Sequence, residues 1–440
     1  MSYRKNKLYN PSSLKGKILL TIFLLLIIQI GCQIPVPFIN HDYLTSTFQN
    51  NTDLFSILNT FTGGAFKNLA FFALGVTPYI TASIILQLLS IAFPKLGEIQ
   101  KDGASGKDKW ERITLITGIV LAFFQSIFLA ISFGRQGLFN KYTWYVVILT
   151  SIIWTIGTAI VSLIGQFITK HGIGNGTSII IAANIIAGLP STAMAIYEMY
   201  LRNKEVVIII LNSFITLAIT FGIIAFVVIL ENAHKDIPIQ YAKSSNYGHK
   251  INSTIPIKLN AANVMPIIFA STIYSLPIMF FGNSTNKVLL SISKFFSSSA
   301  WFDLNHWYYT IGFFVYGLMV IGFAYFYTSI VFNPVEIANN LKKTGAVIPG
   351  IRPGKTTQDY IASQIKYITL MGALFLFVIA EIPTLLSKIF NLGSLSFGGT
   401  SIIIVVGVIT ELTKIIFAEK AIKGYKTSKK SVLFGVPTKL

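Results

Sequence analysis

Few side chains in this sequence could support catalysis or hold a metal ion. The five histidines are scattered through predicted loops without ligand spacing: His41, His171, His234, His249 and His306. The single cysteine, Cys32, excludes an intramolecular disulfide and a cysteine-based metal site. No G-x-x-x-x-G-K-[ST] phosphate loop occurs, and the run GIGNG at 172–176 joins two apolar segments, which predicts a tight turn. We therefore expect no enzymatic activity, no cofactor and no metal site.

Ionisable residues are also nearly absent from the long apolar segments. The first eight segments contain none, apart from residues at their ends such as Arg112. Glu381 lies near one end of the ninth segment, and Glu411 and Lys414 lie near one end of the tenth. Ion-coupled transporters and pumps usually place ionisable groups at mid-membrane. The pattern therefore favours a passive conduit over a coupled carrier.

The apolar segments are the elements that would position any functional residue, and their composition indicates a membrane protein. The chain is 53% hydrophobic and 12% charged, whereas a soluble domain carries about 25% charged residues. A membrane-crossing helix needs about 20 mostly apolar residues. Ten such spans are predicted, at 18–34, 75–93, 112–133, 144–168, 177–195, 206–230, 260–281, 307–332, 366–386 and 399–418. Asn184, Gly188 and Pro190 interrupt the fifth.

The basic residues predict how the spans are oriented. An even number of spans puts both termini on one side, and the connections on that side carry 27 of the 35 Lys and Arg residues, against 8 on the other. This bias explains the net charge of +19 and predicts that both termini are cytoplasmic. The residues before Cys32 fit a lipoprotein cleavage site poorly, so we expect an uncleaved first span.

Three connections between spans are unusual. The long cytoplasmic loops 231–258 and 333–366 are either surfaces that bind partners or basic loops that only orient the protein. The external stretch 35–74 contains a short apolar run, LFSILNTF at 54–61, which cannot cross a bilayer as a helix. Such a run is a re-entrant piece, an interfacial piece or a lid. Irregular backbone at membrane depth must be buried in protein or line a cavity, so a central cavity is indicated.

Five segments resemble the SecY family of protein-export channel subunits, and they occur in the same order as in that family. They are ALGVTPYITASIILQLL at 73–89, GIGNGTSIIIAANIIAGLP at 172–190, PIKLNAANVMPIIFASTIY at 256–274, NPVEIANNLKKTGAVIPGIRPG at 333–354 and FGGTSIIIVVG at 397–407. The run NLKKTGAVIPGIRPG is fairly specific alone, and the ordered set is highly specific.

The resemblance implies an all-α polytopic membrane protein. Ten transmembrane helices would form two inverted five-helix halves around a central hourglass pore with a short plug helix. The implied organisation is a cytoplasmic tail at 1–17, an N-terminal half at 18–195 with the plug segment at 53–64, a C-terminal half at 206–420 and a cytoplasmic tail at 421–440.

The resemblance also implies a pore constriction and a plug. The implied constriction residues are Val76, Ile80, Thr177, Ile181, Ile268 and Ile404, and the implied plug residues are Leu54, Phe55, Ile57, Leu58 and Phe61. Branched aliphatic side chains offer water and ions no hydrogen bond, so a narrow ring of them dewets and blocks ions. Thr177 is polar where the family pattern is apolar. Without the resemblance, these positions would be read as ordinary core or lipid-facing residues.

A lateral gate between the second and seventh spans is implied as well. Its polar candidates are Thr81, Ser83, Gln87, Asn260, Asn263, Ser271 and Thr272. Interhelical hydrogen bonds in membranes average about 0.6 kcal/mol, which suits a gate that must open. Plain helix packing by small polar residues is the rival interpretation. Asn263 stands where the family usually has glycine.

The two long cytoplasmic loops resemble the family's docking surfaces for the SecA motor and the ribosome. Arg352 corresponds to the family's critical loop arginine and would present a guanidinium to a carboxylate or an RNA phosphate. The docking candidates are Arg352, Lys342, Lys343, Lys355, Lys243 and Lys250. Loop 231–258 is less basic than is usual in the family, because Asp236, Ser244 and Ser245 stand where basic residues are expected.

The sequence therefore predicts a passive channel that moves unfolded, presequence-bearing polypeptides across the membrane and releases hydrophobic segments laterally into the lipid bilayer. The implied partners are SecE-type and SecG-type small subunits, a SecA-type motor ATPase and the ribosome, through its rRNA. The expected location is the bacterial plasma membrane, with the plastid thylakoid membrane as the alternative. The rival functions are a dedicated accessory translocon, a small-solute secondary transporter and an insertase or scaffold without a conductive pore.

Overall fold

The computed structural model describes residues 13–40, 58–196, 206–241, 253–282, 284, 286–302, 306–389 and 399–434. Its α-helices are α1 (Leu14–Gly31), α4 (Thr77–Ala92), α5 (Pro94–Lys101), α6 (Gly103–Gly134), α7 (Trp144–His171), α8 (Gly176–Ile196), α9 (Val206–Asn232), α10 (Met265–Phe281), α11 (Lys287–Phe295), α12 (Thr310–Val331), α13 (Pro334–Thr344), α14 (Lys355–Ile389) and α15 (Gly399–Phe434). Its strands are β1 (His234–Tyr241), β2 (Ser253–Lys258) and β3 (Ala346–Val347), and two 3₁₀ turns are η3 (Ser298–Ala300) and η4 (Trp307–Tyr309).

Each of the ten predicted spans falls on a helix, which confirms an all-α polytopic membrane protein. Among the described residues, α1, α6, α7, α12, α14 and α15 are long and apolar enough to cross a membrane by length and composition. The spans on α4, α8, α9 and α10 contain shorter apolar helical stretches.

Large apolar side chains on these helices are exposed, as expected of surfaces that face lipid. Phe23 on α1 is 60% exposed, and Leu318 on α12 is 72% exposed. Exposed apolar patches of this kind would be an aggregation liability on a soluble protein. In a bilayer they are solvated by acyl chains, while the helices satisfy their own backbone hydrogen bonds.

The chain forms two compact units. The first comprises Met1–Asn51, Leu58–Pro190 and Val408–Leu440, and the second comprises Thr52–Ile57 and Ser191–Gly407. In the first unit, α6 packs against α4 and α7. Glycines allow close approach in this unit. A Cβ on Gly118 of α6 would lie 3.1 Å from the Tyr79 backbone of α4, and one on Gly157 of α7 would overlap Phe71 O in the segment before α4.

In the second unit, α12 packs between α10 and α14. An aromatic cluster joins α10 to α12 and to the segment after α11. Trp301, which is 2% exposed, lies edge-on to Tyr274, and its indole Nε1 donates a 3.1 Å hydrogen bond to Phe295 O. Gly312 is required at this contact, because a Cβ there would overlap Phe295 O.

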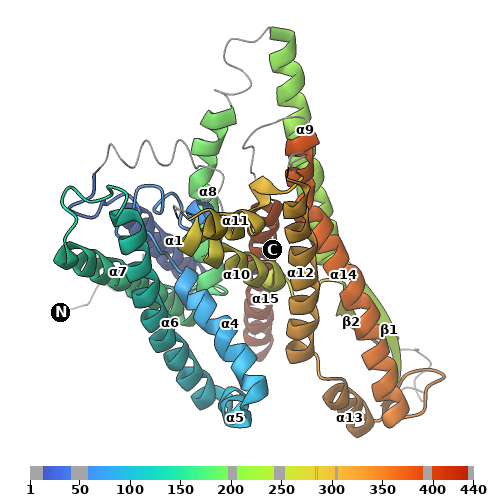
Figure 1. The fold of residues 1–440 in the computed structure, drawn as a ribbon. Coiled ribbons are helices and arrows are strands. Elements are labelled where there is room, and N and C mark those ends of the chain that lie inside the picture. The colour runs from blue at the N-terminus through green and yellow to red at the C-terminus, as the bar shows by residue number, and fades with distance from the viewer. Residues whose placement is uncertain are drawn as a thin grey trace, which may run out of the picture. The chain divides into compact units, whose positions relative to one another are not determined.

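A small antiparallel sheet, which the sequence analysis did not predict, joins the two long loops of the second unit. The strand order is β2-β1-β3, so the 231–258 loop supplies two strands and the 333–366 loop supplies the third. In Figure 1, β1 and β2 lie beside the lower end of α14, with α13 nearby. The two predicted docking loops are therefore parts of one structure.

Candidate functional site

The structured part of the two long loops is the first candidate site, and we call it the connector module: β1, β2, α13, β3 and residues 348–368. β1 is the central strand. It pairs with β2 in the register Ile237↔Ile255 and with β3 in the register Gln240↔Val347. Alternation along β1 buries Ile237 and Ile239 and leaves Pro238 and Gln240 exposed, as expected for a sheet with one face on a core.

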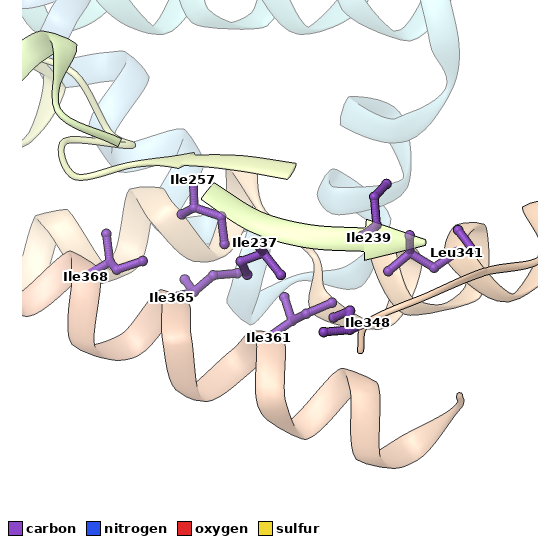
Figure 2. Close-up of a cluster of buried hydrophobic side chains, with 9 residues drawn as sticks. Ile237, Ile239, Ile257, Leu341, Ile348, Ile361, Ile365 and Ile368 are labelled. Atoms are coloured by element: carbon purple, nitrogen blue, oxygen red, sulfur yellow. The ribbon is translucent and has the colours of Figure 1, made fainter. Parts of the chain in front are cut away.

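A core of aliphatic side chains holds the connector module together. Ile361, Ile365 and Ile368 lie on one side of the first turns of α14, facing the strands (Figure 2). The other buried members are Ile237, Ile239, Ile257, Leu341, Ala346 and Ile348. Because strands, α13 and α14 all contribute, removing any one of these elements would expose the side chains of the others.

The Arg352 loop is shaped by glycines and by one side-chain hydrogen bond. Gly345 ends α13 with φ 66°, and Gly350 and Gly354 have φ 79° and 109°, a region in which residues with a Cβ are strained. Thr357, near the start of α14, donates a 2.8 Å hydrogen bond to Arg352 O. The backbone is thereby fixed, while the Arg352 side chain is exposed.

The connector module presents unpaired positive charge. Lys342, Lys343, Arg352 and Lys355 are all exposed, and within the described ranges no ion pair involves any of them. They are therefore free to meet an anionic surface. The remaining docking candidates, Lys243 and Lys250, lie outside the described residues.

The second candidate site is the end of the predicted plug segment, in the first unit. Leu58 and Phe61, in a single helical turn, are each 3% exposed. Leu54, Phe55 and Ile57 lie outside the described residues. The Asn184 side chain on α8 donates from Nδ2 to Phe61 O at 2.9 Å and accepts at Oδ1 from Gln29 Nε2 of α1 at 2.8 Å. One side chain therefore links α1, α8 and the plug segment.

The predicted constriction residues lie on four helices, with one residue just before the first of them. Val76 immediately precedes α4, Ile80 lies on α4, Ile181 on α8, Ile268 on α10 and Ile404 on α15, and each of these five is at most 5% exposed. Thr177, the polar exception, is half-buried. The run GIGNG forms the predicted tight turn, and Asn175 within it accepts a 3.1 Å hydrogen bond from Thr177 N, which caps α8.

The predicted gate residues bond locally. Thr81 donates to Thr77 O at 3.0 Å and Gln87 to Ser83 at 3.0 Å, both within α4. In the second unit, Thr272 donates to Ile268 O within α10.

Two other gate candidates reach neighbouring elements of the second unit. Ser271 lies 3.1 Å from Tyr316 OH, and Asn260 Nδ2 donates to Glu231 Oε1 at 2.6 Å. Asn263 has φ 51°, which explains why it can replace a glycine, because Asn tolerates the left-handed region better than most residues.

Sequence reasoning missed three polar residues that the structure places in buried contacts. Glu231, the next-to-last residue of α9, is 4% exposed, and Gln29 and Asn184 form the hydrogen bond described above. Asn184 was noted only as an interruption of the fifth span. Its polarity inside an apolar helix was the available signal, since a buried amide in a membrane requires partners.

Comparison with known proteins identifies the family. The SecY family model matches residues 70–413. Proteins named "Protein translocase subunit SecY" from Halalkalibacterium halodurans and Bacillus subtilis are each 37% identical to this chain. The first alignment covers 96% of this chain and 98% of the relative, and the second covers 94% and 96%.

Solved structures share the fold at 19% sequence identity, and each alignment covers 93% of both chains. A protein-conducting channel has a TM-score of 0.66. A SecY channel described as closed and sealed by its plug domain has a TM-score of 0.63, as does Sec61 in a canine ribosome–channel complex from the endoplasmic reticulum. The family match and the identity over nearly the whole chain establish that this protein belongs to the SecY family.

Proposed function

We propose that this chain is the central subunit of a protein-conducting channel, which passes unfolded polypeptides across the membrane and releases apolar segments laterally into the bilayer. The observation that carries the proposal is 37% identity, over 96% of the chain, to a protein named as a translocase subunit. The likeness in fold to a protein-conducting channel supports it.

The channel is passive and takes its energy from a partner. Few ionisable residues lie in the spans to support ion coupling. A SecA-type motor or the ribosome supplies the force, and SecE-type and SecG-type subunits complete the complex. Sec61, a structural neighbour, is described in a complex with the ribosome. The excess of basic residues in alternate loops supports an orientation with both termini in the cytoplasm, and the bacterial relatives support a bacterial plasma-membrane location.

The seal consists of an aliphatic ring and a plug. The ring is formed by Val76, Ile80, Ile181, Ile268 and Ile404, with Thr177 as a polar member, and the plug segment is 53–64. The five aliphatic members are branched side chains that offer water and ions no hydrogen bond, which supports a dewetted constriction. A neighbour of the same fold is described as sealed by its plug domain. The lateral gate lies between spans two and seven, and an apolar segment would separate these spans; the described bonds of its polar residues stay within α4 or within the second unit.

The connector module is the docking surface. Its exposed Arg352, Lys342, Lys343 and Lys355 meet the acidic groups of a motor or the phosphates of rRNA. The fixed backbone around Arg352 supports this role, since a loop that is already ordered loses little backbone entropy on binding.

Ion conductance across planar bilayers tests the function. We would reconstitute the full chain with its small subunits and compare it with the double variant Ile181→Gly/Ile404→Gly and with a deletion of residues 54–61. A silent parent with leaky variants is expected, because both changes remove the seal. If both variants stay silent, the ring and plug assignments fail, and a transporter or a non-conductive insertase becomes the better description.

A further inference from the structure

Asn184 forms hydrogen bonds that join three elements at the end of the plug segment. It is 2% exposed, and both polar atoms of its amide are used: Oδ1 accepts from Gln29 Nε2 and Nδ2 donates to Phe61 O, at 2.8 and 2.9 Å. A buried amide in an apolar helix is costly unless its hydrogen bonds are made. Moving Phe61 away therefore leaves Asn184 with an unsatisfied donor.

The backbone next to Phe61 is shaped for this contact. Gly63 has φ 64°, and a Cβ there would lie 3.1 Å from Asn184 Oδ1. A side chain at this position would be strained and would also crowd the amide. The absence of a side chain at Gly63 therefore allows the segment to approach α8.

The plug segment keeps its own shape without Asn184. Thr62 N donates to Leu58 O at 3.1 Å, and Thr62 Oγ1 accepts from Phe66 N at 3.1 Å. These bonds lie within residues 58–66, so the segment can move as a folded piece. The Asn184 bond, in contrast, joins the segment to α8, and breaking it costs no internal structure.

We propose that Asn184, oriented by Gln29, is a positioning residue that holds the end of the plug segment in its closed place. The proposal rests on the proposed function in taking 53–64 as the plug. Asn184 lies on the same helix as Thr177 and Ile181 of the proposed ring, so the bond fixes the plug relative to part of the constriction. A single interhelical hydrogen bond in a membrane is weak enough for an arriving polypeptide to break.

The chain contains its own reporter of this position. Cys32, its only cysteine, is 1% exposed, and its Sγ lies 3.5 Å from Thr62 O. Displacing the segment uncovers this thiol, and a buried thiol reacts only when it is exposed. The rate at which N-ethylmaleimide labels Cys32 therefore measures seating of the segment, independently of whether the chain conducts ions.

The experiment compares variants of the full chain in lipid nanodiscs. Asn184→Leu removes both hydrogen bonds at similar volume, and Asn184→Ala removes both with a smaller side chain. Asn68→Leu is the matched control, because Asn68 is an exposed asparagine in the stretch that follows the plug segment. We expect the two Asn184 variants to be labelled about 3- to 20-fold faster than the parent, the range given by one interhelical hydrogen bond, and the control to be unchanged.

Further variants separate positioning from a general loss of structure. Gln29→Leu should raise labelling less than the Asn184 variants, and the double variant Gln29→Leu/Asn184→Leu should add nothing to Asn184→Leu, because both residues act through one bond. If Asn184→Leu does not fold, Asn184→Ala and Gln29→Leu give the same test. Unchanged labelling in folded Asn184 variants would overturn the inference. Faster labelling with no ion leak in planar bilayers would uphold the positioning role and reject the segment as a plug.

Discussion

The core of the connector module should respond strongly to the loss of a single side chain. Ile361 on α14 is 1% exposed and belongs to the cluster that joins the sheet to this helix. Ile361→Ala removes three buried carbons, which at about 0.8 kcal/mol each is about 2.4 kcal/mol. The cavity left behind raises the cost to about 3 kcal/mol. The module should therefore open about 150-fold more often.

Hydrogen exchange of the full chain in nanodiscs measures this opening. The β1 amides that pair with β2 should exchange about 150-fold faster in Ile361→Ala, while amides in α6 and α7 should not change, because they belong to the other unit. Val335→Ala is the control, because Val335 on α13 is 45% exposed and its truncation should cost less than about 0.5 kcal/mol.

Two outcomes would refute this reasoning. Unchanged exchange along β1 in Ile361→Ala would mean that the sheet does not depend on the α14 contact. An equal effect of Val335→Ala would mean that exchange reports the exposed surface of α13 rather than the core.

Two further predictions concern a glycine contact and the docking loop. Gly157→Ala should lower the free energy of unfolding by about 1–3 kcal/mol, because the new Cβ would overlap Phe71 O. Gly322→Ala on α12 should raise the free energy of unfolding by about 0.5–1 kcal/mol, because a Cβ there meets nothing within 4 Å. Thermal unfolding in detergent measures both, and shifts of the same sign would contradict the packing at Gly157. Arg352→Glu should weaken co-sedimentation with purified bacterial ribosomes about 30-fold, the effect of losing an interface contact worth about 2 kcal/mol. The exposed and predicted external Arg135 is the charge-matched control, and an equal loss in Arg135→Glu would mean that only net charge matters.

The spans could be predicted because a bilayer imposes one simple requirement on a sequence. Runs of about 20 apolar residues predicted the position of a helix for each of the ten spans, but they did not predict where each helix begins and ends. α14 begins at Lys355, whereas the ninth span was predicted from residue 366. The helix continues outside the apolar run because Ile361, Ile365 and Ile368 recur at helical spacing and pack on the sheet. This helical spacing is visible in the sequence, but a search for long apolar runs does not detect it.

The sheet was harder to foresee because its strands are short and lie in two separate loops. Ile237 and Ile239, like Ile255 and Ile257, alternate with other residues, which is the usual pattern of a half-buried strand. β3 contains only two residues and lies over 100 positions further along the chain, so no local pattern could reveal it.

The contacts of the candidate sites are mostly tertiary and therefore invisible to spacing. Gln29 and Asn184 are 155 positions apart, and only the fold brings them together. The docking residue Arg352 was easier to predict from the sequence, since PGIRPG at 349–354 itself indicates a rigid, exposed arginine loop.

The sheet has a mechanical consequence for how a partner's force reaches the membrane. β1 begins two residues after α9 ends, and β2 is separated from α10 by only residues 259–264. That short link is pinned at its start, because Leu259 N donates to Ala233 O at 2.9 Å and Leu259 packs against the module core. If the connector module docks a partner as proposed, a force applied at Arg352 would reach α9, α10 and α14 together, because all three helices adjoin the module. The six-residue link 259–264 would carry that force directly to span seven.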